Sequence, residues 1–335
     1  MGSARSPVNP PEGAKSVVVI GGGTGISSVL KGLKRAPVDL TAIVTVGDDG
    51  GSSGRLRKDY RMSPPGDIRN CLVAMSEADP LVEKLLEYRF EDAILKGHSF
   101  GNLLLVVLTQ LEGDFRKAVD WAADFLQVRG RVIPSTDCRV VLVASHPDGT
   151  RTTGEQRISE CRKAITQMAL LPTPPAVSSE ITEALRLADL VVLGPGSLFT
   201  SIIPNLLVPG FAAALEACMG KIVLVSNLMT QPGETDGLSL SDHLQALKQV
   251  GSLHRLDYLL ADNSEVSDAV KTRYAEAGAT LIRDSDLESG ILDGVSVIHR
   301  PIADLTPSGH WRHHPESLAE ALLGILSQQE IHDES

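Results

Sequence analysis

The sequence lacks the features that mark several large classes of protein. It contains no run of about 18 apolar residues, so no membrane span is predicted. Lysine and arginine are in the minority, 31 against 42 aspartates and glutamates, and the net charge of −11 argues against binding to nucleic acid or an anionic membrane. The four cysteines lie far apart, which is typical of reduced thiols in a cytoplasmic protein rather than of a disulfide or zinc framework.

Signals of nucleophilic catalysis are also missing. The Gly-x-Ser-x-Gly spacing occurs at residues 50–54 and 97–101, but neither stands at the sharp strand-to-helix turn that makes a nucleophile elbow, and there is no Cys/His pair at a helix start. The composition itself is that of an ordinary globular protein, with 42% hydrophobic residues among 335, enough to bury a large core. We predict a single domain over residues 16–328, a disordered leader over 1–15 and a tail over 329–335. The first 13 residues hold three prolines and no apolar core, so they do not resemble a signal peptide.

The most informative stretch is a strand, a glycine turn and a helix between Lys15 and Leu33. The β-branched run Val17–Ile20 predicts a buried strand, and apolar residues recur at helical spacing from Ile26 onwards. Such a turn points backbone N–H groups and a helix N-terminus at an anion. Neither the dinucleotide fingerprint nor the P-loop is complete here, and a glycine turn can also serve only close helix packing. We expect a phosphate over Gly22 to Ile26, and the predicted ligand-binding residues there are Gly22, Gly23, Thr24 and Gly25. The substitution Gly23→Asp is then predicted to abolish ligand binding without unfolding the protein.

A second predicted strand, Leu40–Val46, ends in a glycine-serine loop that carries Asp48 and Asp49, with Ser52 as a further candidate. Adjacent carboxylates are costly unless something pairs with them. The candidate partners are Mg²⁺, which Asp48 and Asp49 would hold, a ligand hydroxyl and Arg55. A solvated loop that only makes turns is the alternative.

Next comes a predicted helix start, residues 64–70, which places Arg69 and Asn70 in the first turn within reach of a phosphate or ribose. A capped surface helix is the alternative. Residues 79–129 predict further helices. We expect one apolar face made of Leu81, Leu85, Leu86 and Tyr88, an all-apolar buried helix over 103–111, and Trp121 and Phe125 in the core.

The second half of the chain repeats the strand-turn pattern. The predicted strand 188–193 is followed by a turn whose ligand-binding candidates are Gly194, Gly196 and Ser197, with Asn205 further along. The predicted strand 222–225 is followed by a polar stretch whose candidates are Asn227 and Thr230. The excursion over 146–157 is expected to cover the site. Histidines 310, 313 and 314 are not expected to bind a metal, because no second cluster completes such a site.

These patterns predict an α/β, Rossmann-like three-layer fold with a mainly parallel sheet and helical insertions. Turns rich in glycine or polar residues follow at least four strands, and all would open on one sheet edge. The ligand that such a crevice favours is a nucleotide or a nucleotide-linked metabolite.

Several long motifs resemble the bacterial gluconeogenesis factor family, often called YvcK-like. They include Val-Val-Val-Ile-Gly-Gly-Gly-Thr-Gly (17–25), Val-Gly-Asp-Asp-Gly-Gly-Ser-Ser-Gly-Arg (46–55), Pro-Pro-Gly-Asp-Ile-Arg-Asn (64–70), Gly-His-Ser-Phe-Gly-Asn (97–102) and Asn-Leu-Met-Thr-Gln-Pro-Gly-Glu-Thr (227–235). The resemblance covers about residues 16 to 326. That family is itself similar to the 2-phospho-L-lactate transferases, which are CofD-like.

The resemblance implies a cytoplasmic protein that binds UDP-sugars, notably UDP-N-acetylglucosamine, and acts in carbon metabolism and cell shape on gluconeogenic substrates. It implies uracil-side and phosphate-side contacts at Tyr274 and Arg312. It leaves open whether the protein is a sensor read by a regulatory protein partner, or a Mg²⁺-dependent transferase of a phosphorylated group. A homodimer is one expected assembly. Where some members carry a phosphorylatable threonine this chain has His314-Pro315, so phosphorylation control there is not expected.

Overall fold

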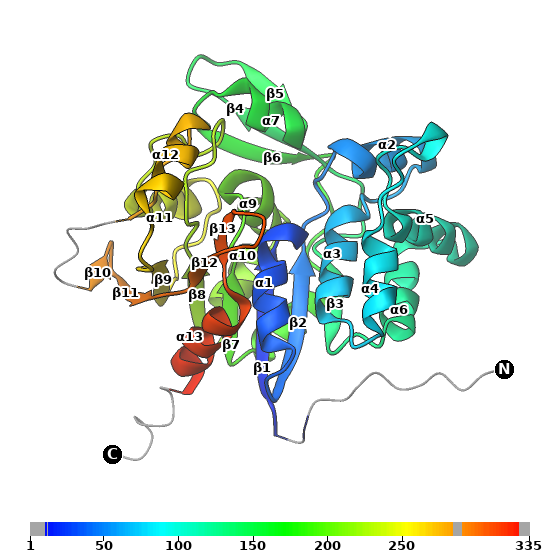
Figure 1. Cartoon of the computed structure of the whole chain (residues 1–335), viewed down its shortest axis with the longest axis horizontal. Helices are drawn as coiled ribbons and strands as arrows, with labels where there is room; N and C mark the ends of the chain where they lie inside the picture. The colour runs from blue at the N-terminus through cyan, green and yellow to red at the C-terminus, as the bar shows by residue number, and fades with distance from the viewer. Residues whose placement is uncertain (1–10, 12, 284–289, 328–335) are drawn as a thin grey trace.

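The computed structural model describes residues 11, 13–283 and 290–327, and a large sheet runs through its middle (Figure 1). Within these residues the sheet has the order β10-β11-β9-β8-β7-β1-β2-β3, and only β10 runs antiparallel to its neighbour. Its strands are β1 (Lys15–Gly21), β2 (Val38–Val44), β3 (Arg131–Pro134), β7 (Leu190–Leu193), β8 (Lys221–Val225), β9 (Tyr258–Asp262), β10 (Ile291–Leu292) and β11 (Val295–Arg300). The α/β fold class with a mainly parallel sheet is thus confirmed.

Helices cover both faces of the sheet, and in the view of Figure 1 α1 and α13 lie in front of it. The helices are α1 (Gly23–Leu33), α2 (Gly51–Tyr60), α3 (Gly66–Met75), α4 (Pro80–Glu87), α5 (Phe100–Glu112), α6 (Phe115–Phe125), α7 (Glu155–Cys161), α8 (Ser179–Leu187), α9 (Ile203–Leu206), α10 (Phe211–Glu216), α11 (Leu240–Gln249), α12 (Asp268–Glu276) and α13 (Pro315–Ser327). A 3₁₀ turn, η1 (Ala93–Leu95), and a π-helix, η2 (Leu198–Ile202), complete the helical elements of the described residues.

Strand β1 explains why both faces need cover. Its residues Val17 to Ile20 are completely buried, and they alternate between two apolar cores. Val17 and Val19 pack with residues of α1, α3 and α13, whereas Val18 and Ile20 pack with residues of α8, α10 and α11. An unbroken β-branched run suits such a strand because no position faces water.

The chain reverses direction across the sheet between β1 and β7. It first adds β2 and β3 on one side of β1, then returns to add β7, β8, β9 and β11 on the other. In open α/β sheets, ligands bind outside the carboxyl ends of the strands at such a switch point. The fold therefore places the ligand crevice where β1 and β7 end.

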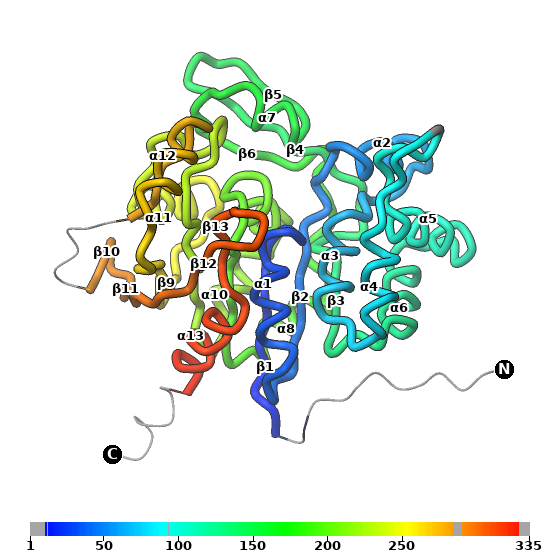
Figure 2. Tube along the Cα trace, in the orientation of Figure 1, coloured from blue at the N-terminus to red at the C-terminus, as the bar shows by residue number. Residues whose placement is uncertain are grey.

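Two small sheets lie outside the large one. The first consists of β4 (Val141–Ser145), β5 (Arg151–Thr153) and β6 (Gln167–Leu171), and with α7 it stands above the upper end of the large sheet in Figure 1. The second is the hairpin of β12 (Ala303–Leu305) and β13 (Trp311–His313). Figure 2 shows this C-terminal hairpin in front of the large sheet, near the start of α1.

Some sequence-based expectations were wrong. The predicted loop 47–55 is helical from Gly51 onwards. Gly-Ser-Ser-Gly has a poor helix propensity, but the helix buries the side chain of Leu56, and this packing outweighs the propensity. Trp121 and Phe125, which were expected in the core, are 45% and 55% exposed. Several apolar side chains that were expected to be buried on α4 and α5 are also exposed: Leu81, Leu85, Tyr88, Val107 and Leu111. These helices form an outer layer that buries only one side. The predicted leader and the tail over 329–335 lie mostly outside the described residues, and Lys15 already belongs to β1.

Candidate functional site

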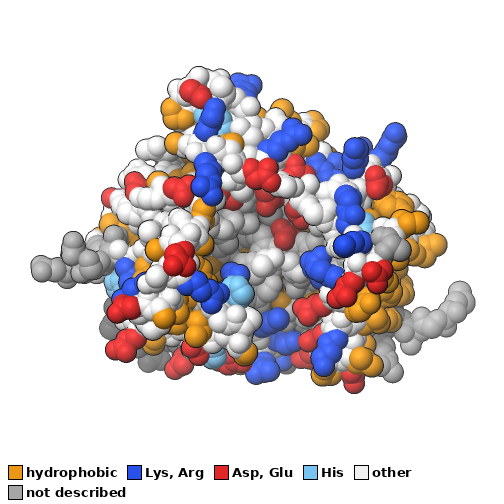
Figure 3. All heavy atoms as spheres, turned by 45° about the horizontal axis from the view of Figure 1, so that its top comes forward, with side chains coloured by type: hydrophobic (Ala, Val, Ile, Leu, Met, Phe, Trp, Pro, Cys, Tyr) orange, Lys and Arg blue, Asp and Glu red, His pale blue; other side chains and the backbone are white. Residues whose placement is uncertain are grey.

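A cavity of about 760 Å³ lies at the carboxyl ends of β1, β2, β7 and β8. Its walls come from the start of α1, the turn after β7, the segment after β8, helix α7 and the β13 hairpin. Figure 3 shows this side of the molecule hollowed, with acidic side chains in and around the hollow. The volume falls within the range of pockets that enclose a small-molecule ligand.

The two glycine turns meet backbone to backbone at this edge. A Cβ on Gly25 would lie 2.1 Å from the carbonyl oxygen of Pro195, and one on Gly22 would lie 2.6 Å from Ser201 Oγ. Side chains at these positions are therefore excluded by the approach of the β7 turn. The β8 segment is tied to the same turn, because Gly196 N donates to Asn227 Oδ1 at 3.2 Å and Gln231 Nε2 donates to Ser197 Oγ at 2.8 Å.

Asp67 occupies the N-terminal end of α1. Its carboxylate accepts hydrogen bonds from the backbone N–H groups of Gly23 and Thr24, which are the donors that the sequence assigned to a phosphate. Burial, with the nearby charge of Asp48, nevertheless raises the pKa of Asp67 to about 7. The helix end thus already holds a carboxyl group, which is about half ionised near pH 7.

Three further carboxyl groups line the cavity: Asp48, Glu155 and Glu234. Burial is the largest cause of a raised pKa in each, and in Glu155 the charges of the other carboxylates add to it. Glu234 accepts a 2.6 Å hydrogen bond from Ser159 Oγ, while Glu155 Oε2 is buried with no hydrogen-bond partner among the described residues. A cation, a proton or a ligand donor would relieve this accumulation of negative charge.

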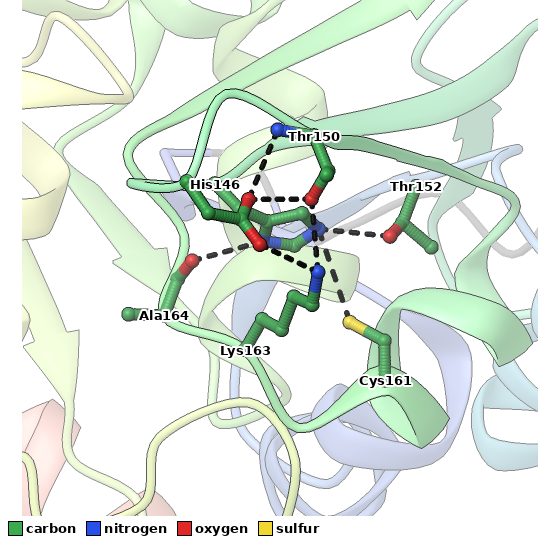
Figure 4. A network of polar contacts seen from close by, with 7 residues as sticks. His146, Thr150, Thr152, Cys161, Lys163 and Ala164 are labelled. Carbon is green, nitrogen blue, oxygen red and sulfur yellow. Dashed lines mark hydrogen bonds and ion pairs between the residues drawn. The ribbon is translucent and has the colours of Figure 1, made fainter.

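Helix α7 carries Glu155 and Ser159 into the cavity, and a polar network fastens it to the small sheet (Figure 4). His146 Nδ1 donates to the Ala164 carbonyl at 2.9 Å, and its Nε2 accepts from Thr152 Oγ1 at 2.8 Å. Cys161 Sγ, at the end of α7, lies 3.9 Å from His146 Nε2. The excursion over 146–157 was predicted to cover the site; its helix α7 does line the cavity through Glu155, whereas no residue of the β4–β5 hairpin is part of the lining.

The opposite wall comes from α12 and β13. Trp311 N donates to Tyr274 Oη at 3.0 Å, which fixes the phenol at the cavity edge. Arg312 is exposed, and its guanidinium has no hydrogen-bond or ion-pair partner in the described part of the chain. His313 Nε2 donates to the Ser226 carbonyl at 3.1 Å, and burial lowers the pKa of His313 to about 4, so this imidazole is neutral.

Many of the residues predicted from sequence do line the cavity: Gly22, Thr24, Gly25, Asp48, Gly196, Ser197, Asn227, Thr230, Tyr274 and Arg312. They come from strand ends that lie far apart in the chain. The expectation that polar turns after four strands open on one edge is confirmed.

Other predicted residues lie beside the cavity rather than on its surface: Gly23, Asp49, Ser52, Arg69, Asn70, Gly194 and Asn205. Ser52 Oγ is buried and lies 2.9 Å from His98 Nδ1, and the buried Asn205 Nδ2 donates to the Ser201 carbonyl at 2.8 Å. Gly194 ends β7 with φ of +73°. Gly194 and Asn205 belong to the turn after β7 and its continuation, which carry lining residues, whereas the contact of Ser52 joins α2 to His98.

The remaining four positions have structural partners. Arg69 Nη2 donates to Asn70 Oδ1 at 2.6 Å, and Asn70 Nδ2 donates to Thr24 Oγ1 at 3.0 Å, so this pair braces the start of α1. Asp49 Oδ1 accepts from Gln156 N at 3.1 Å and lines a different hollow. A Cβ on Gly23 would lie 2.1 Å from the Asp67 carbonyl oxygen. The prediction that Gly23→Asp leaves the fold intact was therefore wrong.

Sequence reasoning missed four lining residues as candidates: Asp67, Glu155, Ser159 and His313. Asp67 had a signal, because a carboxylate follows Pro-Pro-Gly at a predicted helix start. The α7 residues had none, since only the folding of the excursion over the sheet edge brings them there. In the described residues no group of three or more His, Cys, Asp or Glu side chains could hold a metal ion, and no helix is long and apolar enough to cross a membrane.

Comparison with known proteins agrees with this architecture. The family model for 2-phospho-L-lactate transferase CofD matches residues 17–303. A gluconeogenesis factor of Halalkalibacterium halodurans is 45% identical over 310 residues, covering 92% of this chain and 96% of that protein. The chain belongs to the gluconeogenesis factor family. The Bacillus subtilis gluconeogenesis factor is 42% identical over 313 residues, covering 93% of this chain and 98% of that protein.

The family fold is also seen experimentally. An X-ray crystal structure of a Bacillus halodurans protein matches this chain with a TM-score of 0.88 at 44% identity, covering 92% of this chain and 99% of the other. The family resemblance and the fold class predicted from the sequence are thereby confirmed. The residues matched by the CofD family model, 17–303, include most of the cavity lining, whereas the β13 hairpin residues of the lining, from His310 to His313, lie beyond the match.

Proposed function

We propose that the protein is a cytoplasmic UDP-sugar-binding member of the gluconeogenesis factor family. Its ligand is UDP-N-acetylglucosamine, and its role is to regulate carbon metabolism and cell shape during growth on gluconeogenic substrates. The observation that carries the proposal is the guanidinium of Arg312, which has no partner among the described residues and stands on the wall of a cavity whose other side is formed by two glycine turns. An unpaired arginine facing backbone N–H groups suits a diphosphate.

The lining supports a particular orientation of the ligand. The Tyr274 ring provides a flat surface for uracil at one end of the cavity. Ser159, Thr200 and Glu234 form a hydrogen-bonded group that suits sugar hydroxyls, with Thr200 Oγ1 3.2 Å from Glu234 Oε1. The diphosphate would then lie between Arg312 and the start of α1.

A regulatory role requires that a partner protein distinguishes the bound state. A ligand shifts a conformational equilibrium only through its different affinity for the two states. The cavity walls belong to the main sheet, the α7 excursion and the C-terminal hairpin. A ligand that contacts all three would favour the arrangement in which they are close together, and the partner would bind that form.

Calorimetric titration with UDP-N-acetylglucosamine tests the binding proposal. We expect Arg312→Ser to weaken binding about tenfold or more, because one charge-assisted contact is lost. Arg131→Ser is the matched control, since Arg131 is also exposed and without a partner in the described residues but lies at the start of β3. Absence of saturable binding to the unmodified protein, or equal affinity in both variants, would refute the proposal.

A second candidate is a Mg²⁺-dependent transferase of a phosphorylated group from a nucleoside diphosphate donor. The proximity of Asp48 to Asp67 favours it, because the charge of Asp48 adds to burial in raising the pKa of Asp67 at the start of α1. Mg²⁺ is commonly held by one or two carboxylates together with substrate phosphates. These residues fit that pattern, with Asp67 in place of the predicted Asp49, and the ion would supply charge neutralisation at the phosphates.

The two candidates differ in whether product forms. The protein is incubated with UDP-N-acetylglucosamine and Mg²⁺, with and without acceptors from a cell lysate. Turnover that disappears in Asp67→Asn would establish the transferase and overturn the purely regulatory role. Saturable binding without product would leave the sensor and eliminate the transferase.

A further inference from the structure

A second hollow, of about 710 Å³, lies between α2 and the base of the β4–β5–β6 sheet. Its lining comprises Asp49, Gly54, Arg57, Lys58, Cys138, Arg139, Val141 and Pro172. None of these residues lines the first cavity, and the two hollows are separated by the segment after β2, where Asp48 faces one and Asp49 the other. The second hollow is therefore a distinct feature of the same domain.

The charge of this hollow is opposite to that of the whole chain. Three cationic side chains and one carboxylate line it, a net charge of +2 in a protein of net charge −11. Figure 3 shows Lys and Arg side chains gathered on the α2 side of the molecule. The single carboxylate, Asp49, already accepts a hydrogen bond from Gln156 N at 3.1 Å. Most of the positive charge is thus not compensated by the protein.

The three cations differ in how firmly they are held: Arg57 is hydrogen-bonded to the backbone, whereas Lys58 and Arg139 are exposed. Arg57 is half-buried, and its guanidinium donates to the carbonyls of Val140 and, at 3.5 Å, Gly47, which leaves other N–H groups for a ligand. Burial is the main cause of a lowered pKa of Arg57; the charges of Asp49 and Asp48 oppose it, and the charge of Arg139 adds to it. Lys58 and Arg139 are exposed and have no hydrogen-bond or ion-pair partner in the described part of the chain.

Gly54 keeps the floor of the hollow free of side chains. A Cβ at this position would lie 1.9 Å from the Asp49 carbonyl oxygen, so α2 packs directly on the segment after β2. This close approach places the cations of α2 opposite Arg139, which precedes β4. Like charges brought together around an open volume are stabilised by an anion.

We propose that this hollow binds a second ligand, a small molecule that carries a phosphate monoester. A phosphate monoester has a charge of about −1.5 to −2 at pH 7, which balances the net charge of the lining. Arginine presents the forked N–H groups that match phosphate oxygens, and lysine adds a point charge. The volume suits a metabolite of small-molecule size. Because Asp48 lines the first cavity and its neighbour Asp49 lines the second hollow, a ligand bound in one would change the affinity of the other for its ligand.

The proposal is tested with inorganic phosphate, followed by calorimetry or by ³¹P NMR line broadening. Saturable binding to the unmodified protein is expected, and the double variant Lys58→Ser/Arg139→Ser should weaken it about tenfold or more. The control is Lys31→Ser/Arg131→Ser, which removes the same two residue types from exposed positions that have no partner in the described residues and line neither hollow.

No saturable phosphate binding, or equal loss in both double variants, would overturn the proposal. Unchanged phosphate affinity in Lys58→Ser/Arg139→Ser would also overturn the proposal, because the phosphate would then bind at another site. The test does not depend on the first cavity, since Arg312→Ser is expected to weaken UDP-N-acetylglucosamine binding and leave this phosphate site intact. Failure of either proposal is thus visible separately.

Discussion

At the scale of single residues, the site depends on the interaction between the backbone N–H groups at the start of α1 and the carboxyl group of Asp67. The start of α1 offers backbone N–H groups, and Asp67 accepts hydrogen bonds from two of them. The same burial that holds the carboxyl group there disfavours its charge, and Asp48 adds to the effect. A phosphate bound here would compete with a carboxyl group that loses its charge as pH falls through about 7.

This balance predicts the pH dependence of stability. The pKa of Asp67 is about 7 in the folded protein against an ordinary value of 3.8, so between these values the folded state binds more protons than the unfolded state. The free energy of unfolding should therefore fall as pH rises through this window, by at most about 1.4 kcal/mol per pH unit for this group. Asp67→Asn should flatten the profile measured by chemical denaturation between pH 4 and 8.

The control for this prediction is Asp124→Asn, at an exposed carboxylate of α6. Its stability profile should run parallel to that of the unmodified protein. The raised pKa values of Asp48, Glu155 and Glu234 act in the same direction, so some slope should remain in Asp67→Asn. A slope unchanged by Asp67→Asn would show that this carboxyl group is ionised throughout the window.

At the scale of elements, the helices differ in how much of their apolar surface they bury. Helix α6 buries Ala118, Val119 and Ala122 against the core, while Trp121 and Phe125 stack on its open side with ring centroids 5.3 Å apart. The sequence alone shows only that all five are apolar. Helix α6 follows α5 in an outer layer, so one of its faces has no neighbouring element in the described chain.

Substitutions on the two sides of α6 should therefore differ in cost. Val119→Ala removes completely buried methyl groups and should lower the free energy of unfolding by about 2 kcal/mol. Trp121→Gln, at a side chain that is 45% exposed, should cost less than about 1 kcal/mol. Chemical denaturation of both variants measures the difference. A larger loss in Trp121→Gln would mean that this face is covered, for example in a homodimer.

The segment after β8 and helix α7 form a second element-scale contact. A Cβ on Gly233, which has φ of +92°, would lie 1.8 Å from the Ser159 carbonyl oxygen. Gly237 has φ of +70° but nothing within 4 Å of such a Cβ. Substitutions at Gly233 and Gly237 impose the same kind of backbone strain, but only the one at Gly233 disturbs a contact with α7, so comparing them isolates the effect of that contact.

We expect Gly237→Ala to cost only the strain of a left-handed alanine, about 1 to 2 kcal/mol, without changing ligand affinity. Gly233→Ala carries the same strain and also separates the segment from α7, so it should be less stable and should bind UDP-N-acetylglucosamine more weakly. Thermal unfolding and calorimetric titration give the two readings. Equal affinity in both variants would show that the α7 contact does not shape the site.

At the scale of the whole molecule, β1 joins the two cores. Its alternate residues belong to opposite apolar clusters, so neither face of the sheet can keep its packing when the other is lost. We predict a single cooperative unfolding transition in scanning calorimetry, as expected of one domain over residues 16–328. Two transitions separated in temperature would contradict this and would divide the chain into two units.

The parts of the site that could be predicted from sequence are those where local chemistry decides. The glycine turns after β1 and β7 were recognisable because only residues without side chains permit their backbone approach, and Tyr274 and Arg312 followed from the family resemblance. Asp49 was indistinguishable from Asp48 in sequence. Their different directions result from Gln156, a residue more than a hundred positions away, which binds Asp49.

The sequence by itself determined the α/β class, the buried β1 strand and the turns at the strand ends, because hydrophobic period and glycine act over a few neighbouring residues. Only the tertiary structure decided which carboxylates converge, which faces of the outer helices stay open, and that α7 returns over the sheet edge. These depend on contacts between segments distant in the chain, and their energies arise only once the sheet has brought those segments together.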